Sequence, residues 1–219
     1  YTLLEQTPFV KVVKRDFQRG FMSSTDVATY EVFGDMFRSL QKAQGERDAS
    51  GSDQHAAPTP LEPLRFTMRN VIQHGPFAAG QVAAAVVDTD LVFDAANDKT
   101  LTALFGDKKP LTARTVLAFD GGGRTTLESP SLTHVIEAQP QSSQGKVTLV
   151  WGGMKADMVF TRNVESFTLN ATAPSFDMKD EGEGGHAQMA GFTLVAEQKR
   201  VFADEPLLYS GTQTLTIAQ

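Results

Sequence analysis

The side chains that most often carry catalysis or bind metals are few in this sequence and lie far apart in it. No two histidines are separated by two or four residues, the spacings that place a pair on one face of a strand or a helix. The histidines are His55, His74, His134 and His186. The sequence has no cysteine, which excludes thiolate metal ligands, cysteine nucleophiles and disulfide scaffolds. We therefore predict no metal site and no cofactor.

The densest polar cluster is the segment from Asp180 to His186, in which Asp180, Glu181 and Glu183 alternate with glycines. One interpretation is that the carboxylates bind a hard cation such as Ca²⁺. The other is a glycine-rich hairpin tip that stays in water, which the lack of EF-hand ligand spacing favours. An enzyme built on this cluster would need a distant histidine to converge with it.

Three shorter motifs resemble catalytic or binding signatures but lack the parts that those signatures need. Residues 120–125 (DGGGRT) have neither the spacing of a phosphate-binding loop nor a helical run after them, and predict a turn. Residues 39–42 (SLQK) match the S-x-x-K of serine acylases without the companion motifs. Residues 88–90 (DTD) match a metal and sugar-nucleotide motif that also occurs by chance. We predict no catalytic residue and expect that the protein is not an enzyme.

The elements that must position any site are predicted to be strands, because apolar residues alternate with polar ones. Phe66, Met68 and Ile72 share one side of a segment whose other side carries Arg65 and Thr67. Similar short runs bounded by Gly, Pro, Asn or Asp recur to the end of the chain, and they predict about ten strands in an antiparallel meander. Helical spacing occurs only at 35–44 and 98–105. The predicted fold class is mainly β (α+β), with an extended, curved meander sheet and one or two short helices.

The composition indicates one folded domain. The chain has 219 residues, of which 41% are apolar and 21% charged, with a net charge of −6. This charge opposes binding to nucleic acid, which we do not expect as a partner. Residues 45–63 hold almost no large apolar residue and predict a flexible loop within a single domain that spans residues 1–219.

Phenylalanine and methionine dominate the large apolar residues, with 15 Phe and 7 Met against 1 Trp and 3 Tyr. A filled core that needs no polar side chains explains this bias. An open sheet face that lines a groove for an apolar ligand explains it too, and the alternation alone does not separate the two. For the open face, the predicted ligand-binding residues are Phe66, Met68, Ile72, Phe93, Phe119, Trp151 and Phe160.

Several short strings, taken in order, resemble the YdgA-like family of bacterial proteins of unknown function. These are residues 20–24 (GFMSS), 74–77 (HGPF), 111–119 (LTARTVLAF), 151–154 (WGGM) and 189–192 (MAGF). The resemblance implies a periplasmic protein that is held to the bacterial inner membrane by an anchor absent from this chain. It also implies that the chain is an N-terminal portion, distantly similar to AsmA-type envelope proteins associated with lipids. It implies no catalytic residues.

The residues of the first two strings also have direct physical interpretations. Gly20 and Gly75 are predicted to supply turn geometry, and Pro76 to rigidify the exit from a strand. Ser23 and Ser24 fit a hairpin turn that restarts a strand. His74 is interpreted either as a hydrogen-bonded structural residue or as a polar group that faces a ligand.

Two classes of function follow from these observations. The first is a non-enzymatic periplasmic domain that binds a lipid-like apolar ligand or a protein partner. The second is a structural module that associates with a second copy by pairing the edges of its sheet.

Overall fold

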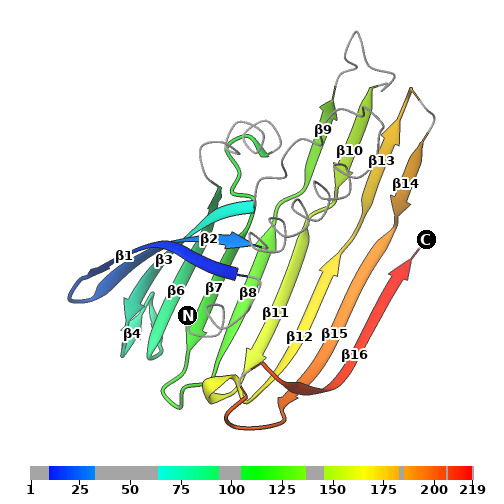
Figure 1. Cartoon of the computed structure of the whole chain (residues 1–219). Coiled ribbons are helices and arrows are strands. Elements are labelled where there is room, and N and C mark those ends of the chain that lie inside the picture. Colours follow the sequence, from blue (N-terminus) through cyan, green and yellow to red (C-terminus); the bar gives the residue numbers. More distant parts are fainter. Residues whose placement is uncertain are drawn as a thin grey trace, which may run out of the picture.

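The computed structural model describes residues 10–32, 64–93, 105–136, 146–182, 185–205 and 207–218 (Figure 1). Its strands are β1 (Val10–Arg19), β2 (Ser23–Val32), β3 (Leu64–His74), β4 (Phe77–Ala78), β5 (Gln81–Val82), β6 (Ala85–Phe93), β7 (Thr112–Leu117), β8 (Gly123–Ser129), β9 (Leu132–Ile136), β10 (Val147–Trp151), β11 (Met154–Phe160), β12 (Ser166–Ala173), β13 (Phe176–Asp180), β14 (His186–Met189), β15 (Gly191–Arg200) and β16 (Tyr209–Ala218); η1 (Arg162–Val164) is a short 3₁₀ turn. The predicted helix at 35–44 and loop at 45–63 lie outside the described residues, as does the helix at 98–105 apart from Phe105.

The predicted antiparallel meander is confirmed. A ten-stranded sheet has the order β1-β2-β3-β6-β7-β8-β11-β12-β15-β16, which is the order of these strands along the chain. Every pair of neighbours is antiparallel. The sheet is curved, and in the view of Figure 1 the hairpin of β1 and β2 runs across the direction of the other strands. The predicted fold class is therefore correct.

A second sheet of four strands, β14-β13-β10-β9, extends the half of the large sheet that ends at β16 (Figure 1). Its strands continue β15, β12, β11 and β8 respectively, and they keep the same neighbours. The two sheets meet along a line that we call the crease, formed by Pro130, Gly152, Gly153, Pro174 and Ala190. Proline cannot donate a ladder hydrogen bond, and Gly153 has a φ of +90°, so the ladders break there.

The number of strands differs from the prediction. About ten strands were expected, whereas the described residues form sixteen. The expected number matches the large sheet alone. The difference arises because four long strands are each divided at the crease, and because the β4–β5 hairpin occupies part of the connection between β3 and β6.

Buried polar residues accompany the small core at the β1–β2 end of the sheet. Tyr30 is buried and its ring stacks on that of Phe66 with centroids 5.4 Å apart. Asp26 is fully buried, and its Oδ1 accepts a 2.9 Å hydrogen bond from Nε of Arg15 on β1. This ion pair joins the two outermost strands at this edge of the sheet.

Candidate functional site

One face of the ten-stranded sheet is apolar across its whole width, and we call it the apolar face. Register partners share a face of a sheet, and successive side chains alternate between faces, so the pairing assigns each residue to one side. The apolar face comprises Ala28, Tyr30, Phe66, Met68, Ile72, Val87, Leu91, Ala113, Leu117, Leu127, Met154, Ala156, Met158, Phe160, Phe167, Leu169, Ala171, Ala173, Phe192, Leu194, Ala196, Leu215 and Ile217.

The large side chains of the apolar face are accessible. Among the described residues, the buried apolar residues are alanines together with Tyr30 and Val86; no Leu, Ile, Met, Phe or Trp is among them. Met158, Phe160, Leu169 and Leu194 are only half-buried, and on the edge strand β16 Leu215 is exposed. A second packed layer would bury such side chains almost completely. The apolar face is therefore open over much of its area.

The apolar face continues past the crease into the small sheet. Trp151 on β10 shares a row with Leu132 and Phe176. Its Nε1 donates a 3.4 Å hydrogen bond to Oγ of Ser129, which lies in the row of Met154 on the large sheet. A regular strand would put residues 151 and 154 on opposite faces. Because the ladder is broken at Gly152 and Gly153, the strand does not alternate regularly there, and the side chain of Trp151 lies on the same face as that of Ser129.

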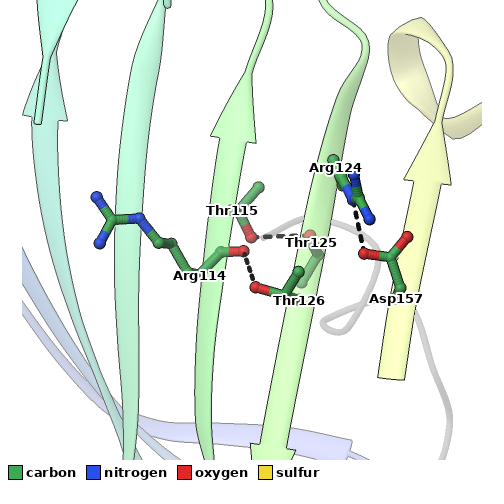
Figure 2. Close-up of polar contacts among 6 residues, drawn as sticks. All are labelled: Arg114, Thr115, Arg124, Thr125, Thr126 and Asp157. Atoms are coloured by element: carbon green, nitrogen blue, oxygen red, sulfur yellow. Dashed lines mark hydrogen bonds and ion pairs between the residues drawn. The ribbon is translucent and has the colours of Figure 1, made fainter. Parts of the chain in front are cut away.

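The opposite face of the sheet is polar and rich in cross-strand ion pairs. Figure 2 shows Nε of Arg124 on β8 bonded at 2.6 Å to Oδ2 of Asp157 on β11. Arg114 pairs with Asp88, and Lys155 with Glu128, on the same face. These side chains remain partly or largely in water, so this face is solvated around the three ion pairs.

Polar side chains also interrupt the apolar face, as hydrogen-bonded pairs between β3 and β6 and between β7 and β8. Oδ1 of the buried Asn70 accepts a 2.7 Å hydrogen bond from Oγ1 of Thr89, and Asn70 is the register partner of Asp26. Oγ1 of Thr115 and Oγ1 of Thr125 are 2.8 Å apart across β7 and β8 (Figure 2). Nδ2 of Asn70 has no hydrogen-bond partner. These pairs satisfy most of the polar groups in an otherwise apolar surface.

The residues predicted to bind a ligand fall into three places. Phe66, Met68, Ile72 and Phe160 lie on the apolar face, and Phe93 is opposite Phe66 in register. Trp151 lies on the small sheet. Phe119 lies in the turn between β7 and β8 with 65% of its surface exposed, and not within a strand as the others do.

The pattern that identified these residues also covered others that were not singled out. Met154, Met158, Phe167, Leu169, Phe192 and Leu194 lie on the apolar face over β11, β12 and β15. The same alternation of apolar and polar residues marks them in the sequence. The alternation shows that the apolar residues of a strand share one side of it. It does not show that the apolar sides of all these strands face the same way in the sheet.

The residues of the first two family strings meet at one end of the sheet. Oγ of Ser24 and Nε2 of His74 are 2.9 Å apart, and the backbone N–H of His74 donates to the carbonyl of Met22. This contact fits the structural interpretation of His74, and a role toward a ligand stays a prediction. A Cβ at Gly20 would overlap the carbonyl oxygen of Ser23, where the chain turns before β2. The Gly75–Pro76 peptide bond is cis.

Among the residues that the structure describes, the polar motifs do not come together; residues 39–42, His55 and Glu183 lie outside the described ranges. Nε2 of His186 lies 2.9 Å from Oδ2 of Asp177, and Oδ1 of Asp180 accepts from the N–H of Gly182, as in a hairpin tip. Within the described ranges, no group of three His, Cys, Asp or Glu residues could hold a metal ion. Oδ1 of Asp120 accepts from the N–H of Gly122, which confirms the predicted turn.

A hollow of about 920 Å³ lies along the crease, and its lining includes residues of both faces of the sheet. Thr112, Glu128, Lys155, Thr172 and Thr193 form one row of register partners across its lining. The row's charges, Lys155 and Glu128, pair with one another at 3.3 Å. The hollow therefore presents no uncompensated charge in this row.

The fold and the candidate site define an open antiparallel β-sheet domain with one accessible apolar face. A family model described as "Bacterial protein of unknown function (DUF945)" matches residues 1–219, and the chain belongs to this bacterial family. No curated protein and no solved structure gave a significant match. In the part of the chain that the structure describes, no helix is both long enough and apolar enough to span a membrane.

Proposed function

We propose that this chain is a non-enzymatic domain that binds a lipid-like apolar ligand along its apolar face. The observation that carries the proposal is the accessibility of this face: its Met, Phe and Leu side chains are half-buried or exposed, although they line the centre of a ten-stranded sheet. Monomeric proteins rarely leave a continuous apolar surface of this kind without a use for it. Unbranched Met and flat Phe side chains adapt to acyl chains of varied shape.

The location of the domain is part of the same proposal. Its resemblance to YdgA-like and AsmA-type envelope proteins supports an anchored position on the periplasmic side of the bacterial inner membrane. A lipid-like ligand is the apolar compound that an envelope supplies in quantity. A protein partner with an apolar surface is the alternative occupant of the apolar face.

A fluorescent fatty acid with a 16-carbon chain is a suitable probe for the apolar face. We expect Met158→Asp to weaken its binding by about tenfold or more, because the variant places a carboxylate where the acyl chain would be buried. Val159→Asp is the matched control, since Val159 is the next residue of β11 and lies exposed on the polar face. Equal affinities of the two variants in fluorescence titrations would contradict the proposal, as would a wild-type chain that does not bind the probe.

A second candidate function, self-association through a sheet edge, is favoured by the composition of β16. Residues 207–219 contain no charged residue and no proline, whereas the opposite edge strand β1 carries Lys11, Lys14, Arg15 and Asp16 and has a register shift between Val12 and Lys14. Charges and bulges are the usual means by which proteins protect a free edge from pairing. The two edges of this sheet therefore differ in whether they resist a further strand.

The backbone of β16 is oriented to accept another strand. The carbonyl of Leu208 accepts from the N–H of Val201, and that of Ala218 accepts from the N–H of Ala190, so both point toward β15. Backbone groups of successive strand residues point to alternate sides. The odd-numbered residues from Tyr209 to Ile217 consequently direct their N–H and C=O groups to the free edge. A second copy can pair with them in antiparallel register centred on Gln213.

A cysteine at position 213 tests this pairing, because the chain has no cysteine of its own. Facing residues of a hydrogen-bonded antiparallel pair have Cα atoms about 5.5 Å apart, within disulfide range. We expect Gln213→Cys to form covalent dimers under mild oxidation, while Lys11→Cys on the protected edge does not. A wild-type chain that is strictly monomeric in light scattering at its highest soluble concentration would exclude self-association.

A further inference from the structure

Five connections join neighbouring strands of the large sheet without passing through the small sheet or through a long undescribed segment. All five lie at one end of the large sheet, which we call the hairpin end. They are residues 20–22, 75–84, 118–122, 161–165 and 201–208, of which residue 206 is outside the described part. In a meander, every second connection must lie at the same end of the sheet. Figure 1 shows the tips of β1–β2, β7–β8, β11–β12 and β15–β16 along this end.

Four of these five connections carry a phenylalanine that stands in water. Phe21 is 99% exposed, Phe77 72%, Phe119 65% and Phe202 55%. In contrast, Phe66, Phe160, Phe167 and Phe192, which lie in strands on the apolar face, are all half-buried. The tips also expose Met22, Val82, Val201, Leu207 and Leu208. The hairpin end is thus a second apolar surface, built from turns and separate from the apolar face.

The four phenylalanines form a row and not a compact patch. Neighbouring connections at this end are two strands apart, or about 10 Å along the sheet, so the row extends over several such steps. Protein interfaces gather their aromatic anchors near the centre of a patch and surround them with a polar rim. A row of side chains on separate turns instead matches a broad, deformable surface that each tip enters independently.

The charges at the hairpin end indicate what kind of surface it could contact. The five connections contain one basic residue, Arg162, and four acidic ones, Asp120, Glu165, Asp204 and Glu205. The connection from 75 to 84 has no charged residue at all. Attraction to anionic headgroups or to nucleic acid is therefore absent here, and apolar contact must provide the binding.

We propose that the hairpin end docks on the surface of a lipid bilayer, with Phe21, Phe77, Phe119 and Phe202 entering the headgroup region. The proposal goes beyond ligand binding by the apolar face and does not depend on it. It assigns Phe119 to a membrane contact, which fits its exposure in the turn between β7 and β8. The orientation that results sets the strands upright on the bilayer, so one end of the apolar face adjoins the lipid.

Co-sedimentation with vesicles of phosphatidylcholine, a lipid of no net charge, tests the proposal. We expect wild-type chain to sediment with the vesicles, and the variant with Phe21, Phe77, Phe119 and Phe202 all replaced by serine to bind at least about tenfold more weakly, because four apolar side chains no longer leave water. Raising the salt concentration should have little effect, since the contact is apolar. The matched control replaces Val159 and Val195, exposed valines of the polar face, with serine and should bind as wild type does.

A single substitution tests whether misfolding of the fourfold variant, and not the loss of the phenylalanines, causes weaker vesicle binding. Phe21 is almost fully exposed, so Phe21→Ser should leave the unfolding transition unchanged and still weaken vesicle binding severalfold. With Trp151 replaced by Phe, a Phe21→Trp variant should shift its fluorescence to the blue on vesicles.

The proposal is overturned if the wild-type chain stays in the supernatant, if the serine variants bind as tightly as wild type, or if binding requires anionic lipid and disappears in salt. Met158→Asp should retain vesicle binding, which separates this result from the test of the apolar face.

Discussion

Replacing Arg15 with methionine is expected to lower the free energy of unfolding by about 3–5 kcal/mol, because it leaves the carboxylate of Asp26 buried without its counter-ion. Asp26 is 0% exposed, and Nε and Nη2 of Arg15 donate to its two oxygens at 2.9 and 3.3 Å. Methionine keeps most of the apolar stem of the arginine, so the loss reports mainly the charge. Chemical unfolding followed by circular dichroism measures it.

The two partners of this pair should not be equivalent. Arg15 is 39% exposed and can turn toward water when its partner changes, whereas Asp26 cannot. Asp26→Asn retains an acceptor oxygen and removes the buried charge, so it should cost less than Arg15→Met. The double variant should be more stable than Arg15→Met alone, because a neutral amide costs less to bury than a carboxylate.

An exposed pair of the same chemistry supplies the control. Nε of Arg124 and Oδ2 of Asp157 are 2.6 Å apart, but the side chains are 64% and 32% exposed. Arg124→Met should change the stability by no more than about 1 kcal/mol. If the two arginine variants lost equal stability, the burial of Asp26 would not be the cause of the effect.

The second large effect is expected from Gly75→Ala, which should destabilise the chain by about 2–3 kcal/mol through overpacking. An added Cβ would overlap the carbonyl oxygen of Ala83 and come within 2.9 Å of that of Ala84. Both are backbone atoms and cannot rotate away. Ala83 is buried with Ala78 and Val86 in a small cluster, so displacing it disturbs the packing under the β3–β6 connection.

Gly191→Ala is the matched control for this substitution. A Cβ at Gly191 would meet the Cβ of Ala218 at 3.7 Å, an ordinary van der Waals contact, in a β-strand. Its effect should stay within about 0.5 kcal/mol. Thermal and denaturant midpoints of both variants provide the comparison, and a Gly75→Ala variant as stable as Gly191→Ala would show that the β3–β6 connection relaxes easily.

Much of the fold could be predicted from the sequence because strand alternation is a local property. Residues 64–74 alternate between apolar and polar side chains, and in the structure Phe66 and Met68 share a face that Arg65 and Thr67 do not. The turn at Asp120–Gly122 was equally predictable, since Gly121 has a φ of +88° and Asp120 bonds to the backbone of Gly122. Short connections also made the pairing of β1 with β2, of β7 with β8 and of β11 with β12 predictable.

The candidate site could be predicted only in part, because it depends on contacts between distant residues. Alternation gave no reason to pair Asp26 with Arg15, or Ser24 with His74, which are 50 residues apart. It marked Trp151 as apolar but could not place it on the side of Ser129, since that depends on how the ladder breaks at the crease. It also grouped Phe119, which stands in a turn, with the aromatic residues of the strands, and the assignment of this residue to ligand binding stays a prediction.

The sequence by itself determined a mainly β chain whose strands are apolar on one side, because the two-residue period of a strand depends only on residues that are neighbours in the chain. The tertiary structure alone decided whether the apolar sides of ten strands would close on a second layer or remain accessible. It also decided that Phe21, Phe77, Phe119 and Phe202 would gather at one end. Both outcomes depend on how residues far apart in the chain are stacked by the meander, and no local pattern of side chains records that arrangement.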